Sequence, residues 1–233
     1  MRITIIGLCA LLVTSAGIGL VQAQQQSPQE RVAALKGNLA ASQAALRQYE
    51  WIETTVISLK GEERSRQQNR CYHGADGVLQ KVPVAAPPPA EKKRGLRGKI
   101  VENKKEELAD YMKEAVSLVR QYVPPDPARI QAVKDAGHVT LQPDGTGKRL
   151  RLTFAGYLKP GDSLGVDVDL ASNSILGLKV ATYLASPQEA ATLDVRFATL
   201  SDGASYPSNV TLDAQAKNLT VAVQNSGYRK LAP

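Results

Sequence analysis

Residues Ile100–Val123 read IVENKKEELADYMKEAVSLVRQYV, and the fold prediction starts from this stretch. Its apolar side chains recur three, four or seven residues apart, which places them in one stripe along a helix of 3.6 residues per turn. The stripe consists of Val101, Leu108, Met112, Ala115, Val119 and Tyr122. The opposite face is charged, with Glu102, Lys104, Lys105, Glu106, Asp110, Lys113, Glu114 and Arg120, so the sequence predicts an amphipathic helix with one face turned toward an apolar surface.

From His138 onward, apolar residues recur at every second position instead of at helical spacing. This alternation predicts half-buried strands with one apolar and one polar face. The alternating residues fall into six groups: Leu150–Phe154, Leu164–Leu170, Leu176–Val180, Leu193–Phe197, Val210–Leu212 and Leu219–Val223. Short links join most of these groups, which is typical of antiparallel neighbours. The apolar face of such a sheet needs a cover, and the helix stripe matches it.

The chain before the long helix predicts one helix and three strands. Ser27 and Pro28 form a helix start, and that helix is expected to run to about Gln48. Strands are expected at Tyr49–Lys60, Glu62–Tyr72 and Val78–Val84. The second of these strands is polar almost throughout, so we expect it to be edge-like.

Two breaks frame the long helix. Residues 85–99 contain three consecutive prolines followed by a basic run, and they are expected to form a connector without regular structure. Pro124-Pro125 ends the helix. Asp126-Pro127 then starts a shorter helix that Gly137 terminates.

These elements together predict an α+β fold. We expect a curved antiparallel sheet, a half-barrel of about ten strands, with an N-terminal helix and a central helix pair on its concave side. On the polar face we expect Arg151 to lie opposite Asp169, and Asp167 opposite Lys179. Those pairings join apolar faces and opposite charges at once.

The first 23 residues have the pattern of a secretory signal peptide. Met1-Arg2 is a short basic start, Ile3–Val21 is almost wholly apolar, and Ala23 stands at the cleavage position. An apolar run of this length can alternatively serve as a membrane anchor. We expect cleavage near Ala23, a periplasmic or secreted location, and a single exported domain over residues 24–233. Cys71 would then be the one remaining cysteine, either buried and inert or free to pair between chains.

The sequence predicts no catalytic residue, metal site or cofactor, and hence a protein that is not an enzyme. Cys71 and His73 share a strand face, but a zinc site needs three or four protein ligands and no second cluster is visible. A phosphate-binding loop needs a glycine five positions before the Gly147-Lys148 pair and a Ser or Thr after it, but Gln142 and Arg149 stand at those positions in the segment around Asp144–Lys148. We interpret it as a hairpin turn.

The formal net charge of +7 bears on possible partners. A basic run can contact an anionic membrane surface peripherally, or it can be a solvated loop. The run consists of Lys92, Lys93, Arg94 and Arg97. Export argues against nucleic acid as a partner.

The order of these features resembles the layout of the LolA, LolB and RseB group of periplasmic proteins. This resemblance rests on four features: the export signal, the helix before Tyr49-Glu50-Trp51, the interrupting helices and the closing segment Asn225–Lys230. It covers Gln29–Lys230 and is one of layout. It implies a half-barrel that shelters acyl chains or lipid-linked protein, as in outer-membrane lipoprotein sorting.

Two functions therefore stand open. The first is an exported, non-enzymatic binding protein that shelters an acyl chain, a lipid or a lipid-anchored protein in a concave apolar cavity. The second is a structural or regulatory protein-interaction module of the cell envelope, in which the helix fills that cavity. The residues expected to line the cavity are Trp51, Leu108, Met112, Val119, Phe154, Val166, Val168, Leu178, Val195 and Phe197.

Overall fold

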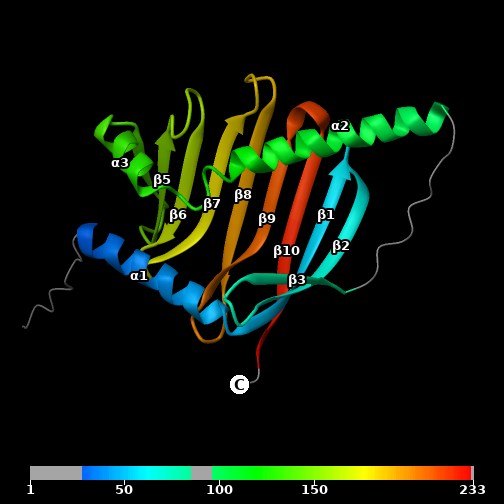
Figure 1. The fold of residues 1–233 in the computed structure, drawn as a ribbon. Coiled ribbons are helices and arrows are strands. Elements are labelled where there is room, and N and C mark those ends of the chain that lie inside the picture. Colours follow the sequence, from blue (N-terminus) through cyan, green and yellow to red (C-terminus); the bar gives the residue numbers. More distant parts are fainter. Residues whose placement is uncertain (1–27, 85–95, 232–233) are drawn as a thin grey trace, which may run out of the picture.

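The structure is a computed structural model that describes residues 28–84 and 96–231. Ten strands form one antiparallel sheet in the order β3-β2-β1-β10-β9-β8-β7-β6-β5-β4. They are β1 Tyr49–Leu59, β2 Glu62–His73, β3 Leu79–Pro83, β4 Val139–Pro143, β5 Arg149–Ala155, β6 Ser163–Asp169, β7 Ser174–Tyr183, β8 Ala190–Thr199, β9 Ser205–Ala214 and β10 Leu219–Lys230. The sheet is open, with β3 and β4 at its edges, and it is strongly twisted (Figure 1). The predicted α+β half-barrel with about ten strands is confirmed.

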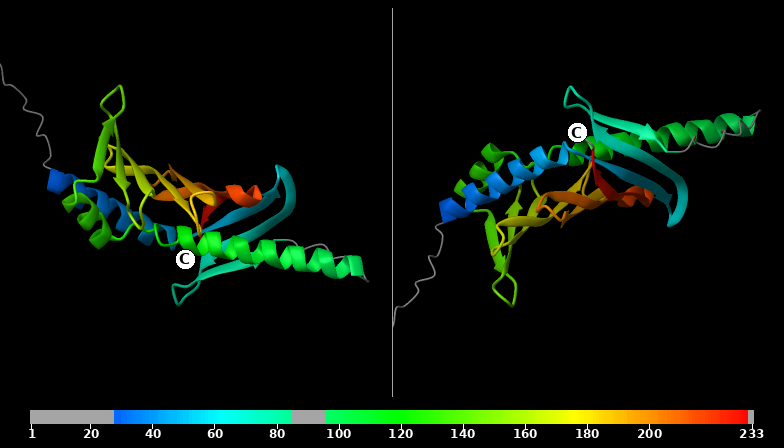
Figure 2. Two further views of the ribbon diagram at one scale, coloured as in Figure 1. Left: turned by 90° about the horizontal axis from the view of Figure 1, so that it is seen from above. Right: turned by 90° about the horizontal axis from the view of Figure 1, so that it is seen from below.

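Three α-helices lie along one side of the sheet, while the β4–β5 hairpin projects toward the other side (Figure 2). They are α1 Pro28–Leu46, α2 Leu96–Val119 and α3 Pro127–Asp135, and a short 3-10 helix, η1 Gln215–Lys217, joins β9 to β10. Helix α1 crosses one end of the strands and α2 crosses the other end (Figure 1). Contacts join α1 to β7 and β9, α2 to β8 and β9, and α3 to β5.

The core lies between these helices and the apolar face of the sheet. Ala115, Val119 and Tyr122 from α2 and the turn after it are buried there. The buried sheet residues are Phe154, Leu164, Val166, Val168, Leu178, Val180, Leu193, Val195, Leu212, Ala214 and Leu219. Most of the core is therefore formed by the helix stripe and the sheet face that the sequence predicts to pack together. Full burial of each large aliphatic or aromatic side chain stabilises the fold by about 1.5–3 kcal/mol.

The boundaries differ from the prediction at two places. Helix α2 begins at Leu96, inside the connector expected over residues 85–99. Strand β2 lies one strand in from the edge, because β3 pairs with its last part, Asn69–His73. The predicted signal peptide and most of the predicted connector fall outside the described residues. Helix α3 begins as expected, with the Asp126 carboxylate accepting a hydrogen bond from the Ala128 amide.

The predicted register of the polar face is wrong by two residues. Arg151 lies opposite Asp167, not Asp169, and Lys179 lies opposite Gly165 on β6 and Asp194 on β8. The cause is that both connections are tighter than expected, since Ala155 already pairs with Ser163 and Asp169 with Ser174. A shift of two residues keeps every side chain on its face, so the apolar face was predicted correctly although the charge pairs were not.

Tight turns of defined chemistry shorten these connections. In the β5–β6 loop, the Asp162 carboxylate accepts hydrogen bonds from the amides of Leu158 and Lys159. In the β6–β7 turn, the Asp169 carboxylate accepts from the amides of Ala171 and Ser172. Each aspartate therefore closes its own turn.

Candidate functional site

The structure brings nine of the ten predicted cavity residues together on the helix-bearing side of the sheet. Six are buried in one cluster: Val119, Phe154, Val166, Val168, Leu178 and Val195. Leu108, Met112 and Phe197 are partly buried and pack against that cluster. A hollow beside Phe197, between α1 and the sheet, has a volume of only about 20 Å³, which is room for about one water molecule. The helices therefore close the apolar face here.

Trp51 is the tenth predicted residue, and it belongs to a separate aromatic cluster on β1, β9 and β10. Its ring stacks on Tyr228 with centroids 5.4 Å apart, and its indole N–H donates to the Asn225 side chain over 3.2 Å. Tyr206 and Tyr49 also contact the Tyr228 ring. Burial raises the pKa of Tyr228 above its usual value. The sequence predicts a strand at Tyr49–Lys60 but not its pairing with β10, which brings Tyr49 and Trp51 together with Tyr228.

Helix α2 is fixed firmly at its C-terminal end. Tyr122, in the turn that follows the helix, is completely buried. Its hydroxyl donates to the Asp162 carboxylate over 2.5 Å and lies 2.8 Å from the Thr182 hydroxyl. Burial and the hydrogen bond to Asp162 raise the pKa of Tyr122. Since buried polar groups are costly to leave unpaired, this network pins the end of α2 to the β5–β6 loop and to β7.

The preceding part of α2 is held less firmly. Leu108 and Met112 are only half-buried on the sheet side of the helix. The Tyr111 hydroxyl is buried without a hydrogen-bond partner among the described residues. An ion pair ties this part to η1, with Lys217 Nζ 2.6 Å from Glu107 Oε1, and both side chains are exposed. Solvent and salt weaken exposed ion pairs, so this tether opposes movement only slightly.

Helix α1 covers the other end of the apolar face through specific polar contacts. The Asn38 side-chain amide donates to the carbonyls of Ser172 and Asn173 in the β6–β7 turn. The buried Ser42 hydroxyl accepts from the Ser205 amide at the start of β9 over 3.0 Å. Two separated attachments to the sheet make α1 a fixed part of the scaffold.

Cys71 is buried, as one of the two predicted states requires. Its exposed fraction is 0%, the thiol is free, and burial raises its pKa. A thiol with a raised pKa in an apolar setting is inert. Within residues 28–84 and 96–231, no group of three or more His, Cys, Asp or Glu side chains is placed to hold a metal ion. In the same described part, no helix is long and apolar enough to cross a membrane.

Comparisons with known proteins return fold neighbours. No protein-family profile matches the sequence, and no curated protein matches it. The described layout is similar to a LolA superfamily protein from Nitrosomonas europaea, with a TM-score of 0.39, 8% identity, and 85% of this chain and 94% of that chain covered. It is also similar to a putative outer membrane lipoprotein-sorting protein domain from Vibrio parahaemolyticus, with a TM-score of 0.38, 10% identity, and 87% and 94% covered.

A third neighbour is a DUF1329 family protein from Desulfovibrio piger. Its TM-score is 0.36 and its identity 8%, with 86% of this chain and 92% of that chain covered. The resemblance of layout inferred from the sequence is thus found among solved structures.

Proposed function

We propose that this protein is an exported, non-enzymatic binding protein that shelters an acyl chain, a lipid or a lipid-anchored protein on the apolar face of its sheet. In this proposal α2 is a hinged cover. The observation that carries the proposal is the unequal attachment of α2, which is anchored by a buried network at Tyr122 and tethered upstream by the exposed Glu107–Lys217 pair.

The surface beneath the upstream part of α2 suits an elongated apolar ligand. Ile57 on β1 and Val210 and Val221 on β9 and β10 face the core cluster but stay partly exposed. These residues continue the apolar face beside the buried cluster residues of β9 and β10, Leu212, Ala214 and Leu219. Apolar surface of this kind gains about 25 cal/mol for each Å² that a ligand removes from water.

Ligand entry requires the cover to move, because the apolar face is closed in the present structure. The hinge would be the segment after Val119, where the helix ends and the Tyr122 network begins. Swinging α2 about this end separates Leu108 and Met112 from the sheet while the buried network stays intact. Covers of this type belong to the less stable parts of a fold.

The direct test is a search for ligand in the purified protein, followed by titration with a fluorescent fatty acid. Mass spectrometry of an organic extract should reveal a co-purified acyl compound. Met112→Glu, which places a charge on the sheet side of α2, should weaken fatty-acid binding by about tenfold or more, since an unpaired charge is costly in apolar surroundings. Ser117→Glu adds the same charge on the exposed side of α2 and should leave binding unchanged.

A lipid-free extract, together with equal binding by the two variants, would contradict the proposal. Circular dichroism of both variants checks that each is folded. The titration is the stricter part of the test, because a weakly held ligand can be lost during purification.

The edge strand β3 supports a second candidate function, the protein-interaction module. Four aliphatic side chains on and beside β3 are exposed: Val78, Leu79, Val82 and Val84. An edge strand with apolar side chains can accept a strand from a partner protein. Under this second function, α2 stays closed, no acyl compound co-purifies, and a bound partner peptide slows amide exchange at Leu79, Gln80, Lys81 and Val82.

A further inference from the structure

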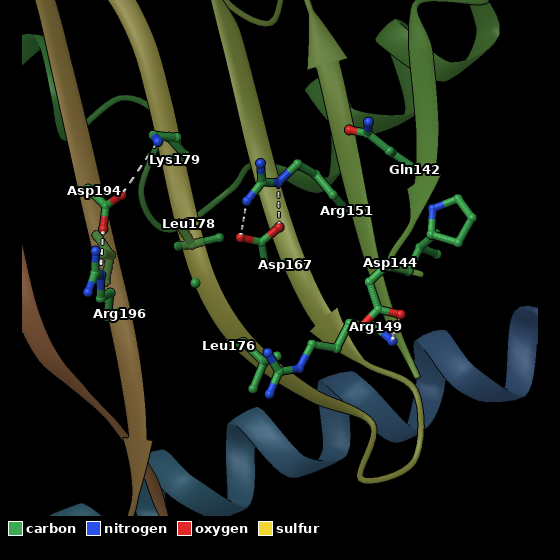
Figure 3. Close-up of a pocket in the computed structure, with 14 residues that line it drawn as sticks. Gln142, Asp144, Arg149, Arg151, Asp167, Leu176, Leu178, Lys179, Asp194 and Arg196 are labelled. Carbon is green, nitrogen blue, oxygen red and sulfur yellow. Dashed lines mark hydrogen bonds and ion pairs between the residues drawn. The ribbon is translucent and has the colours of Figure 1, made fainter. Parts of the chain in front are cut away.

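The polar face of the sheet carries a hollow that the sequence does not predict. It has a volume of about 610 Å³ and is lined by residues of β4, β5, β6, β7 and β8 (Figure 3). The β4–β5 hairpin projects on this side of the sheet and forms one wall. The hollow lies opposite the helices, so it is separate from the apolar face on which the proposed function rests.

Positive charge exceeds negative charge in this hollow. Four cationic side chains line it, Arg149, Arg151, Lys179 and Arg196, against three carboxylates, those of Asp144, Asp167 and Asp194. A cation that is already paired with one of these carboxylates has fewer N–H donors free for a ligand, so the partners of each carboxylate matter.

Two of the carboxylates, those of Asp144 and Asp167, already accept hydrogen bonds from other groups of the protein. Asp167 accepts from Arg151 at both of its oxygens, over 2.6 and 2.7 Å, which satisfies both groups. Asp144 accepts from the Thr146 hydroxyl and from the amides of Thr146, Lys148 and Arg149 in its own turn. Neither carboxylate neutralises the remaining cations.

The third carboxylate is shared. Asp194 Oδ2 lies 3.8 Å from Lys179 Nζ, and Asp194 Oδ1 lies 3.4 Å from Arg196 Nε. One negative charge thus serves two cations, both at distances longer than a good hydrogen bond. On the opposite wall, the Arg149 side chain extends from β5 toward Leu176 (Figure 3). Its backbone stands opposite Asp169 on β6, and the Arg149 charge is one cause of the lowered pKa of Asp169, but its guanidinium makes no hydrogen bond or ion pair to a side chain of the described residues.

The floor between these walls is open because Gly177 carries no side chain. Gly177 pairs with Asp167 on β6 and with Arg196 on β8, so it stands on the polar face between the two walls. A Cβ atom there would approach the Val195 carbonyl oxygen to 3.0 Å. A concave surface with one sign of charge in excess concentrates ions of the opposite sign.

We propose that this hollow binds a ligand with more than one phosphate group, one held by Arg149 and another by Lys179 and Arg196. Guanidinium groups donate in pairs to phosphate oxygens, which makes arginine well suited to this role. The same chemistry fits a soluble polyphosphate ester and the headgroups of an anionic phospholipid surface. The two sources are separated by experiment.

The test measures two probes against the full chain: tripolyphosphate by calorimetry and phosphatidylglycerol vesicles by co-sedimentation, with phosphatidylcholine vesicles as the neutral comparison. Arg149→Gln and Arg196→Gln should each weaken the binding of the effective probe by about tenfold, since hydrogen bonds to charged groups contribute about 1.5–3 kcal/mol. Arg66→Gln is the matched control. It removes the same charge from β2, on the same face but outside the hollow.

If the protein binds tripolyphosphate, and if Arg149→Gln and Arg196→Gln weaken that binding, the ligand is a soluble polyphosphate ester. Binding of phosphatidylglycerol vesicles alone, weakened in the same way, assigns a lipid surface. The proposal is overturned if neither probe binds, or if Arg66→Gln weakens binding as much as the hollow variants do. Fatty-acid binding on the opposite face should stay unchanged in all three variants, so failure here is distinguishable from failure of the proposed function.

Discussion

At the scale of single residues, the buried carboxylate of Asp162 connects several parts of the fold through hydrogen bonds. Its side chain is 3% exposed, yet it accepts hydrogen bonds from Tyr122 and from two amides of its own loop. A buried carboxylate is tolerated when such donors satisfy it. The position therefore joins three parts of the chain: the end of α2, the β5–β6 loop and, through Thr182, strand β7.

Removing one hydroxyl from this network should measure its strength. Tyr122→Phe removes one of the three donors to Asp162 and the hydroxyl that pairs with Thr182, so we expect the free energy of unfolding to fall by about 1–3 kcal/mol. Urea denaturation measures this change. Tyr183→Phe is the control, since it removes an exposed hydrogen bond to the Pro160 carbonyl in the same loop, and a loss as large in the control would show that the buried network has no special strength.

Asp169 should make stability depend on pH. The pKa of Asp169 is lowered, first by the hydrogen bond from the Ser172 amide and then by the one from the Ala171 amide. A lowered folded-state pKa stabilises the protein above the unfolded-state pKa, and this contribution is lost as pH falls through the folded-state pKa. Asp169→Asn should therefore melt at a lower temperature than the parent at neutral pH, with the gap narrowing in acid. A gap that stays constant down to pH 2 would argue against this.

At the scale of elements, the sheet register has a specific energetic signature. Arg151 faces Asp167, whereas Asp169 lies two residues farther along β6 and faces Arg149. A double-mutant cycle on Arg151→Ala and Asp167→Ala should give a coupling energy of about 0.2–1 kcal/mol, the usual range for exposed pairs. The parallel cycle with Asp169→Ala should give a coupling close to zero, and the reverse order would support the register predicted from the sequence.

The sequence predicts which side chains lie on the apolar face of the sheet better than it predicts which residues of neighbouring strands stand opposite each other. Alternation in β5–β8 identified the apolar face because burial has a period of two in every strand. Register depends on turn length, and the turns were set by hydrogen bonds of Asp162 and Asp169 that apolar patterning does not reveal. The sequence also does not predict that α2 begins at Leu96, because the basic, glycine-containing residues before Ile100 are typical of a loop.

At the scale of the whole molecule, one sheet separates two surfaces of different chemistry. The helix-bearing side is apolar and closed, and the amphipathic pattern of residues 100–123 predicted it. The other side is polar and hollowed. Its hollow could not be predicted, because it depends on the direction of the β4–β5 hairpin and on the missing side chain of Gly177 in the middle of β7.

The central claim, that α2 opens to admit an apolar ligand, can be tested by locking the helix. Glu107→Cys combined with Lys217→Cys places two thiols at the exposed tether between α2 and η1, where a short bismaleimide can bridge them. Cys71 is fully buried and should not react. Asp110→Cys with Lys113→Cys is the matched control, because its bridge lies within α2 and leaves the helix free to move.

The measurement is the rate at which each bridged protein takes up a fluorescent fatty acid. We expect the α2–η1 bridge to abolish uptake, and the bridge within α2 to leave uptake at the level of the unbridged protein. Equal uptake by both bridged proteins would contradict the claim that α2 is the cover.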